Sequence, residues 1–109
     1  MSEPVTLYMT AGSKDEAVSI ARALVNAKLV ACANVVDPVT SVFEWDGAVA
    51  EDSETVVFFK TTQACVERAI ERIVELHSYD VPCVTALPIG GGYAPYLTWV
   101  KQETGSEVS

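Results

Sequence analysis

The stretch that decides the fold is ACANVVDPVTSVFEWDGAVAEDSETVVFFK, which covers residues 31–60. Two runs rich in β-branched and small apolar residues flank Asp46-Gly47, and Asp-Gly is a strong signal for a two-residue hairpin turn. The pattern predicts a long strand from Ala31 to Phe43 and a returning strand from Glu51 to Lys60. Pro38 predicts a bend or a sheet edge, because proline cannot donate a ladder hydrogen bond.

The segment before this hairpin predicts a strand and then a helix. Apolar and polar side chains alternate from Val5 to Met9, which is the period of a strand. Gly12 ends that strand. Ser13, followed three residues later by Glu16, forms a capping-box pattern, in which the serine oxygen accepts a backbone N–H and the glutamate reaches back. We expect a helix with an alanine-rich apolar face that continues towards Leu29.

The segment after the hairpin predicts a second helix, a fourth strand and a terminal element. Thr62 is expected to cap a helix that ends near His77, and Val81 to Leu87 is expected to form the strand. Residues 90–92 are glycines, which predict a flexible turn or, alternatively, backbone N–H groups for an anion. Residues 94–102 are expected to form a short helix or strand, and the polar residues 103–109 a frayed tail.

The order β-α-β-β-α-β predicts an α+β, ferredoxin-like domain, in which two helices cover one face of an antiparallel sheet. We expect a single domain over residues 1–109. The non-alternating runs Val56-Val57-Phe58-Phe59 and Val35-Val36 call for burial on both faces of the sheet, although two helices cover only one. We therefore expect self-association, since large apolar patches mark interfaces. The alternative is that the terminal segment with Trp99 covers the second face.

Composition excludes several classes of partner. Fifteen acidic residues against seven basic ones give a formal net charge of −8, whereas nucleic-acid binding requires basic residues that neutralise phosphates. We expect neither a nucleic-acid nor a membrane partner, because no apolar run approaches the length of a membrane span. The cysteines are three, an odd number without Cys-x-x-Cys spacing, which favours a reducing, cytoplasmic location. We read no secretory signal at the start of the chain.

Five motifs together resemble the CutA family of divalent-cation tolerance proteins, and the match covers roughly Val5 to Lys101. The motifs are Leu29-Val30-Ala31-Cys32-Ala33-Asn34, Ser41-Val42-Phe43-Glu44-Trp45-Asp46-Gly47, Phe59-Lys60-Thr61, His77-Ser78-Tyr79-Asp80-Val81-Pro82 and Tyr96-Leu97-Thr98-Trp99. The resemblance implies a ferredoxin-like subunit in a tight homotrimer, linked to copper and divalent-metal tolerance. It also implies a likeness to trimeric nitrogen-signalling regulators, which bind effectors between subunits.

The resemblance suggests a metal site that contains His77 with Met9 as a soft substitute ligand, and the thiol of Cys32 is a further candidate ligand for a soft metal. Met9 stands where a bacterial relative has a cysteine proposed as a copper ligand, and Leu76 stands where it has a second histidine. A thioether would favour Cu(I) over Cu(II). His77 has an alternative structural role, because an imidazole at a helix C-terminus interacts well with the helix dipole. Cys32 also has one, since a buried cysteine packs as a small hydrophobe.

A second candidate is a ligand site for a small anion in a cleft between subunits. We expect it to be lined by Trp45, Glu54, Lys60, Tyr96 and Trp99, because a lysine beside aromatic side chains suits a carboxylate. The alternative role of the aromatics is subunit packing. No nucleophile–base set is apparent around the single histidine, so we expect no enzyme activity and no required cofactor. A purely structural trimer that anchors another protein is the third hypothesis.

Overall fold

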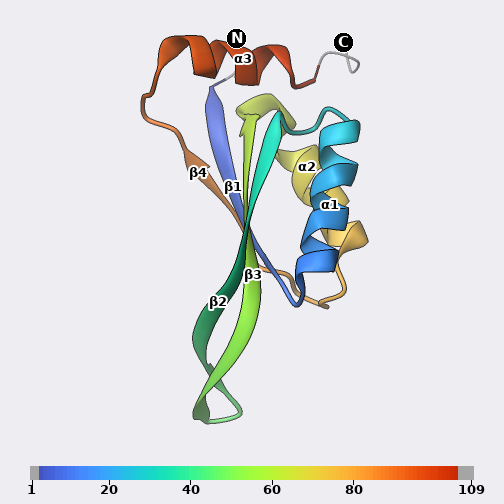
Figure 1. The fold of residues 1–109 in the computed structure, drawn as a ribbon, viewed down its shortest axis with the longest axis vertical. Helices are drawn as coiled ribbons and strands as arrows, with labels where there is room; N and C mark the ends of the chain where they lie inside the picture. The colour runs from blue at the N-terminus through green and yellow to red at the C-terminus, as the bar shows by residue number, and fades with distance from the viewer. Residues whose placement is uncertain (1–2, 106–109) are drawn as a thin grey trace.

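The computed structural model describes residues 3–105. Its elements are β1 (Pro4–Ala11), α1 (Lys14–Asn26), β2 (Cys32–Trp45), β3 (Ala48–Thr62), a short 3-10 turn (Gln63–Cys65), α2 (Val66–Leu76), β4 (Val84–Pro88) and α3 (Ala94–Gln102). The strands form one sheet in the order β2-β3-β1-β4, and every neighbouring pair is antiparallel. The predicted ferredoxin-like α+β fold is confirmed, and the terminal segment is a helix (Figure 1).

The core lies between the sheet and helices α1 and α2, which cover one face together (Figure 1). Leu7 and Phe59 from neighbouring strands are fully buried, as are Ile20 of α1 and Ile73 of α2. Leu7 and Phe59 are direct cross-strand partners, so they join the two central strands beneath the helices. None of the helices within residues 3–105 is long and apolar enough to cross a membrane.

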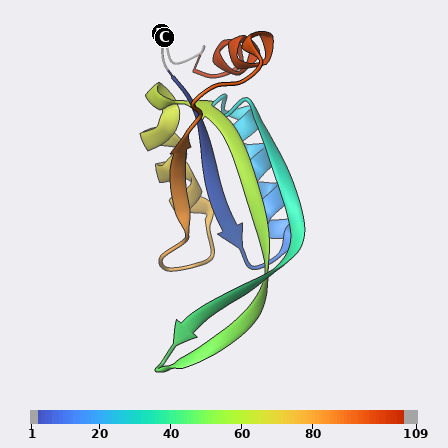
Figure 2. The same cartoon turned by 90° about the vertical axis from the view of Figure 1, so that its left-hand side faces the viewer.

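The opposite face of the sheet, which we call the open face, carries Tyr8, Asn34, Val36 and Phe58. Phe58 pairs with Tyr8 on one side and Asn34 on the other, and the rings of Phe58 and Tyr8 meet edge to face at 5.6 Å. Helix α3 lies across one end of the sheet and leaves the rest of this face uncovered (Figure 2). Coverage by the terminal segment is therefore only partial.

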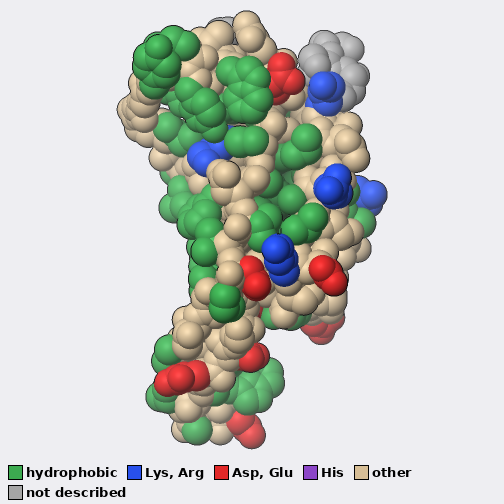
Figure 3. All heavy atoms as spheres, in the orientation of Figure 1, with side chains coloured by type: hydrophobic (Ala, Val, Ile, Leu, Met, Phe, Trp, Pro, Cys, Tyr) green, Lys and Arg blue, Asp and Glu red, His purple; other side chains and the backbone are tan. Residues whose placement is uncertain are grey.

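The β2–β3 hairpin continues well beyond the rest of the sheet (Figure 1). The last β1 pair joins Ala11 to Thr55, so residues 39–54, here called the arm, form a two-stranded ribbon. Asp46 and Gly47 at its tip have φ of 55° and 84°, as a type I′ turn requires. The arm exposes Val42, Phe43, Trp45 and Val49, and Figure 3 shows apolar and acidic side chains interleaved there.

Three expectations about element ends need correction. Thr62 precedes the 3-10 turn but makes no side-chain capping hydrogen bond. Strand β4 begins at Val84 rather than Val81, because the preceding residues form a loop. The tail is anchored as far as Gly105, whose N–H donates to the Lys28 carbonyl at 2.8 Å, and Thr104 is buried. The remainder of the expected tail, 106–109, lies outside the described residues.

The register confirms the bend predicted at Pro38. The β2–β3 pairing shifts between Val36 and Val39, and β2 is an edge strand of the sheet. An edge position and an irregularity in pairing are the two places where a strand tolerates proline. The bend lies where the arm leaves the body of the molecule.

Candidate functional site

His77 follows the last residue of α2 and is held by hydrogen bonds on both ring nitrogens. Its Nε2 donates to the Thr10 carbonyl at 2.8 Å, and its Nδ1 accepts the Tyr79 N–H at 3.1 Å. One donor and one acceptor define a neutral imidazole with its proton on Nε2. The residue is 8% exposed, and its side chain is fully buried. This arrangement leaves no ring lone pair free for a metal and favours the structural role.

Glu16 joins helix α1 to the segment after α2. Its Oε2 accepts the Ser78 N–H at 2.7 Å, and its Oε1 accepts the Ser78 hydroxyl at 3.0 Å. The Ser13 half of the capping box is confirmed, since Ser13 Oγ accepts the Glu16 N–H at 3.1 Å. The carboxylate, however, binds Ser78 instead of reaching back to Ser13. Burial alone would raise the pKa of Glu16, but the two hydrogen bonds from Ser78 oppose burial, and the pKa is lowered.

Tyr79 and Glu54 connect that same segment to the arm. The Tyr79 hydroxyl donates to Glu54 Oε2 at 2.8 Å, and the Ser41 hydroxyl donates to Glu54 Oε1 at 2.6 Å. Burial, followed by the hydrogen bond to Glu54, raises the pKa of Tyr79 to about 12. The phenol therefore remains a donor across the physiological pH range. Glu54 thus binds structural partners at the base of the arm rather than lining a ligand cleft within one chain.

The three candidate metal ligands are not brought together in one chain. Met9 is fully buried in the core beneath the helices. Cys32 is half-buried on the other side of the sheet, where its Sγ lies 3.5 Å from the Tyr96 hydroxyl. Within residues 3–105, no group of three or more His, Cys, Asp or Glu side chains is arranged to hold a metal ion.

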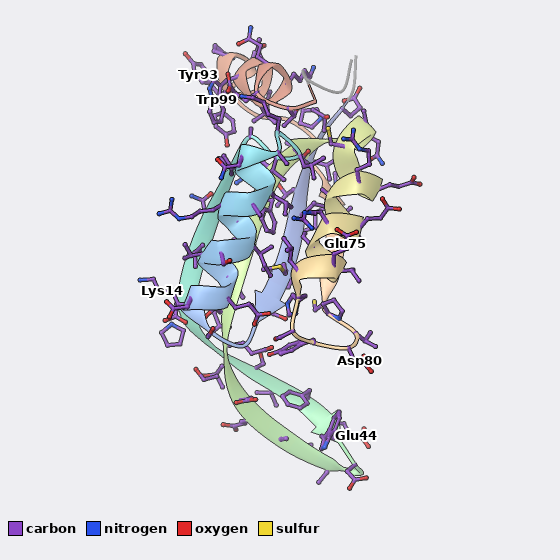
Figure 4. The ribbon with its side chains drawn as sticks, turned by 90° about the vertical axis from the view of Figure 1, so that its right-hand side faces the viewer. Lys14, Glu44, Glu75, Asp80, Tyr93 and Trp99 are labelled. Carbon is purple, nitrogen blue, oxygen red and sulfur yellow. The ribbon has the colours of Figure 1, made fainter. Side chains whose placement is uncertain are left out.

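The five candidate ligand-binding residues are spread along the molecule, with Glu54 at the base of the arm and the other four towards the two ends. Tyr96 and Trp99 lie on α3 with ring centroids 5.8 Å apart, close to Lys60, which pairs with Cys32 across the β2–β3 ladder. Trp45 is 72% exposed at the tip of the arm. Figure 4 shows this separation, with Trp99 and Tyr93 at one end and Glu44 beside the arm tip at the other.

Lys60 has no carboxylate partner within the part of the chain that the structure describes. The ion pair found there is Arg72–Glu75, whereas His77 Nδ1, which accepts a hydrogen bond from the backbone, lies 3.6 Å from Glu16 Oε2. Lys60 Nζ makes only a long contact of 3.4 Å with Asn34 Oδ1. In a chain with a net charge of −8, an ammonium group without a carboxylate beside aromatic rings is an available contact for an anion.

Sequence reasoning missed the connection that Ser41, Tyr79 and Ser78 make between α1, the segment after α2 and the arm. Glu16 and Ser78 are 62 positions apart, and Tyr79 and Glu54 are 25 apart. The available signal was the run of polar side chains at residues 77–80, directly after α2. A simple connecting loop does not require such a run. Such a run indicates side chains that bind neighbouring elements.

Replacing Glu16 with glutamine should flatten the acid side of the stability profile. Because folding lowers the pKa of Glu16, its contribution is present above its ordinary value of 4.5 and is lost as the pH falls through the folded-state value. Near neutral pH, we expect Glu16→Gln to unfold at a lower urea concentration than the wild type. As the pH falls through the folded-state pKa of Glu16, the free energy of unfolding should decrease less in the variant than in the wild type. Glu71→Gln, on the exposed side of α2, is the matched control, and parallel pH profiles for wild type and Glu16→Gln would contradict the assignment.

Comparison with known proteins identifies the family. The family model for the CutA1 divalent ion tolerance protein matches residues 5–103. The divalent-cation tolerance protein CutA of Thermus thermophilus is 42% identical over 99 residues, which are 91% of this chain and 96% of that relative. The chloroplastic CutA of Arabidopsis thaliana is 41% identical over 100 residues. The chain spans 55% of that plant relative's length.

Solved structures agree with the sequence matches. The Thermus thermophilus protein has a TM-score of 0.90 at 40% identity, with 94% of this chain and 99% of that chain covered. The CutA1 structure from Oryza sativa has a TM-score of 0.92 at 36% identity, with 95% of each chain covered. The strand order, the long hairpin and the terminal helix described above therefore belong to a fold that these proteins share. The chain is a member of the CutA1 divalent ion tolerance protein family.

Proposed function

We propose that this protein acts in divalent-cation tolerance as a non-enzymatic homotrimer that binds copper between its subunits. The observation that carries the assembly is the apolar surface left unburied in one chain. Phe58 and Tyr8 lie on the open face, and Val42, Phe43, Trp45 and Val49 are exposed along the arm. Surfaces of this kind are typical of interfaces between chains.

The sheet edges also support assembly. Strands β2 and β4 form the two edges of the sheet, and an open edge presents backbone groups for a further strand. A groove of about 320 Å³ lies beside the β2 edge, with Val18, Val25 and Val35 among its lining residues. Head-to-tail contacts between different surfaces form a ring when the rotation between copies closes, and three copies are the number implied by the resemblance to CutA proteins.

Sedimentation velocity should give a mass of three chains, and a charge on the open face should reduce it. Val36, 45% exposed on that face, would be changed to aspartate, because an unpaired carboxylate in an apolar interface opposes association. Val74→Asp on α2 is the matched control, since Val74 is 48% exposed on the helical side. We expect Val36→Asp to sediment as a smaller species and Val74→Asp to remain trimeric. A monomeric wild type would reject the assembly.

Copper, in this proposal, is carried by Cys32. Both nitrogens of His77 are engaged with the protein, and Met9 is fully buried. Cys32 is the candidate donor on the open face, where its half-buried thiol lies 3.5 Å from the Tyr96 hydroxyl. Thiolates select Cu(I), and one thiolate needs further donors, which the equivalent residues of neighbouring subunits would supply.

Anaerobic titration with Cu(I) against a chromogenic chelator should detect this site. The wild type is expected to remove copper from the chelator at a fixed ratio per chain, and Cys32→Ser should lose that capacity because a hydroxyl is a poor ligand for a soft metal. Cys83→Ser, which alters an exposed thiol, should retain it. Equal binding by the two variants, or none by the wild type, would count against copper carriage by Cys32.

A second candidate function is the binding of a small anionic effector near Lys60. The observation in its favour is the lysine without a carboxylate partner beside Cys32, Tyr96 and Trp99. A neighbouring subunit that covers the open face would convert this exposed surface into a cleft, the usual form of a small-molecule site.

Thermal denaturation with small carboxylates such as succinate and citrate tests the effector site. A bound anion should raise the melting temperature of the wild type, and Lys60→Met should remove the shift. Lys14→Met provides a control at the exposed start of α1 (Figure 4). Shifts of the same size in all three proteins would show that Lys60 is not the contact.

The location that we propose is a reducing compartment such as the cytoplasm. Cys32, Cys65 and Cys83 are all free thiols, which is the usual state of cysteines under reducing conditions. Relatives in this family carry other locations in their names, including a chloroplastic protein from Arabidopsis thaliana and a periplasmic one from Archaeoglobus fulgidus.

A further inference from the structure

The arm's own backbone pairing does little to fix its angle relative to the body of the subunit. Beyond the pair Ala11–Thr55, it consists of two strands that pair only with each other. A two-stranded ribbon is only marginally stable in water. Its base also contains the register shift between Val36 and Val39, where a hairpin can bend.

One carboxylate at this base binds two different parts of the chain. Glu54 is the last arm residue of β3, and its Oε1 accepts the Ser41 hydroxyl of β2 at 2.6 Å. Its Oε2 accepts the Tyr79 hydroxyl at 2.8 Å. The first bond joins the two arm strands, whereas the second joins the arm to a segment that is not part of the hairpin.

The segment that carries Tyr79 is itself fixed to the body of the molecule. His77 binds the Thr10 carbonyl of β1, and Ser78 binds Glu16 of α1 through its N–H and its hydroxyl. The Tyr79 ring packs on the His77 ring with centroids 4.7 Å apart. The loop that continues to Asp80 lies level with the point where the arm leaves the body (Figure 4).

Gly12 provides the space that this arrangement needs. A Cβ atom at position 12 would lie 3.3 Å from the Tyr79 hydroxyl oxygen and 3.5 Å from its ring. That separation is tighter than ordinary contact. The end of β1 therefore leaves a gap for the phenol on its way to Glu54, and a larger residue at this position would push the ring away.

We propose that Tyr79 is a latch that fixes the arm relative to the body of the subunit, by bonding Glu54 from a segment anchored on β1 and α1. The latch determines the orientation in which the arm presents its apolar side chains to another copy of the chain. This effect on assembly is the one part of the inference that rests on the proposed trimer. The fixed angle of the arm itself is a property of a single chain.

Hydrogen–deuterium exchange followed by peptide mass spectrometry tests the latch with Tyr79→Phe. The variant keeps the aromatic ring and removes only the bond to Glu54. We expect exchange across residues 39–54 to accelerate by about tenfold, since a hydrogen bond to a charged acceptor contributes that much locally. Exchange in the β1-paired part of β3 and in α1 should not change.

Two further variants keep the test decisive. Tyr93→Phe makes the same chemical change at the 76% exposed start of α3, at the other end of the molecule (Figure 4), and should leave the arm as in the wild type. Gly12→Ala, which leaves the Tyr79 hydroxyl in place but crowds it, should reproduce the acceleration. Unchanged exchange in the arm of Tyr79→Phe, or acceleration spread over the whole chain, would overturn the latch.

Sedimentation of the same samples separates this inference from the proposed assembly. Exchange is compared between samples of equal sedimenting mass, so that a change in the arm cannot arise from dissociation. If the wild type is monomeric, the trimer is rejected while the exchange result still decides whether Tyr79 fixes the arm. If the wild type is trimeric and Tyr79→Phe sediments as a smaller species, the latch controls assembly as well.

Discussion

The position of β3 between β1 and β2 is the constraint on which the rest of the structure depends. A central strand has neighbours on both sides and both of its faces to cover, but α1 and α2 cover only one. The consecutive residues Phe58 and Phe59 lie on opposite faces of this strand. Phe59 is fully buried under the helices, whereas Phe58 lies half-buried on the open face. The same strand then runs past the end of β1 into the arm, where it exposes further apolar residues. A single chain therefore buries the apolar residues on one face of its central strand and leaves those on the other face partly exposed.

The segment after α2 shows why a histidine in a metal-tolerance family need not be a ligand. An α-helix ends with unsatisfied carbonyl groups. The residues that follow the helix set the direction that the chain takes. Here His77 bonds β1, Ser78 bonds α1, and Tyr79 bonds the arm. Each bond uses a polar atom that a metal or substrate would otherwise need. The residues that carry the family resemblance at this place therefore hold the loop after α2 against β1, α1 and the arm.

Local signals predicted the fold well, because they act over a few residues. Ser13 caps α1, Asp46-Gly47 turns the hairpin, and the doubled Phe58-Phe59 revealed a sheet with two apolar faces. The site was less predictable because its partners are distant in sequence. Even spacing placed Glu54 and Lys60 on one face of β3, but at about 3.3 Å per residue they are about 20 Å apart. No pattern in the sequence indicated that Glu54 would bind Tyr79, since that bond depends on where the loop after α2 falls.

The distance between Trp45 and the other predicted aromatic residues of the cleft has a consequence for assembly. Trp45 is exposed at the tip of the arm, whereas Tyr96 and Trp99 belong to α3 and Lys60 lies near the opposite end of β3. No motion of the hairpin within one chain closes that gap, because β3 runs continuously from one group to the other. Any site that contains both groups must take the arm from one copy and the α3 end from another. The arm's angle then decides whether the two meet, and under the proposed latch the Glu54 carboxylate contributes to such a site by holding the arm.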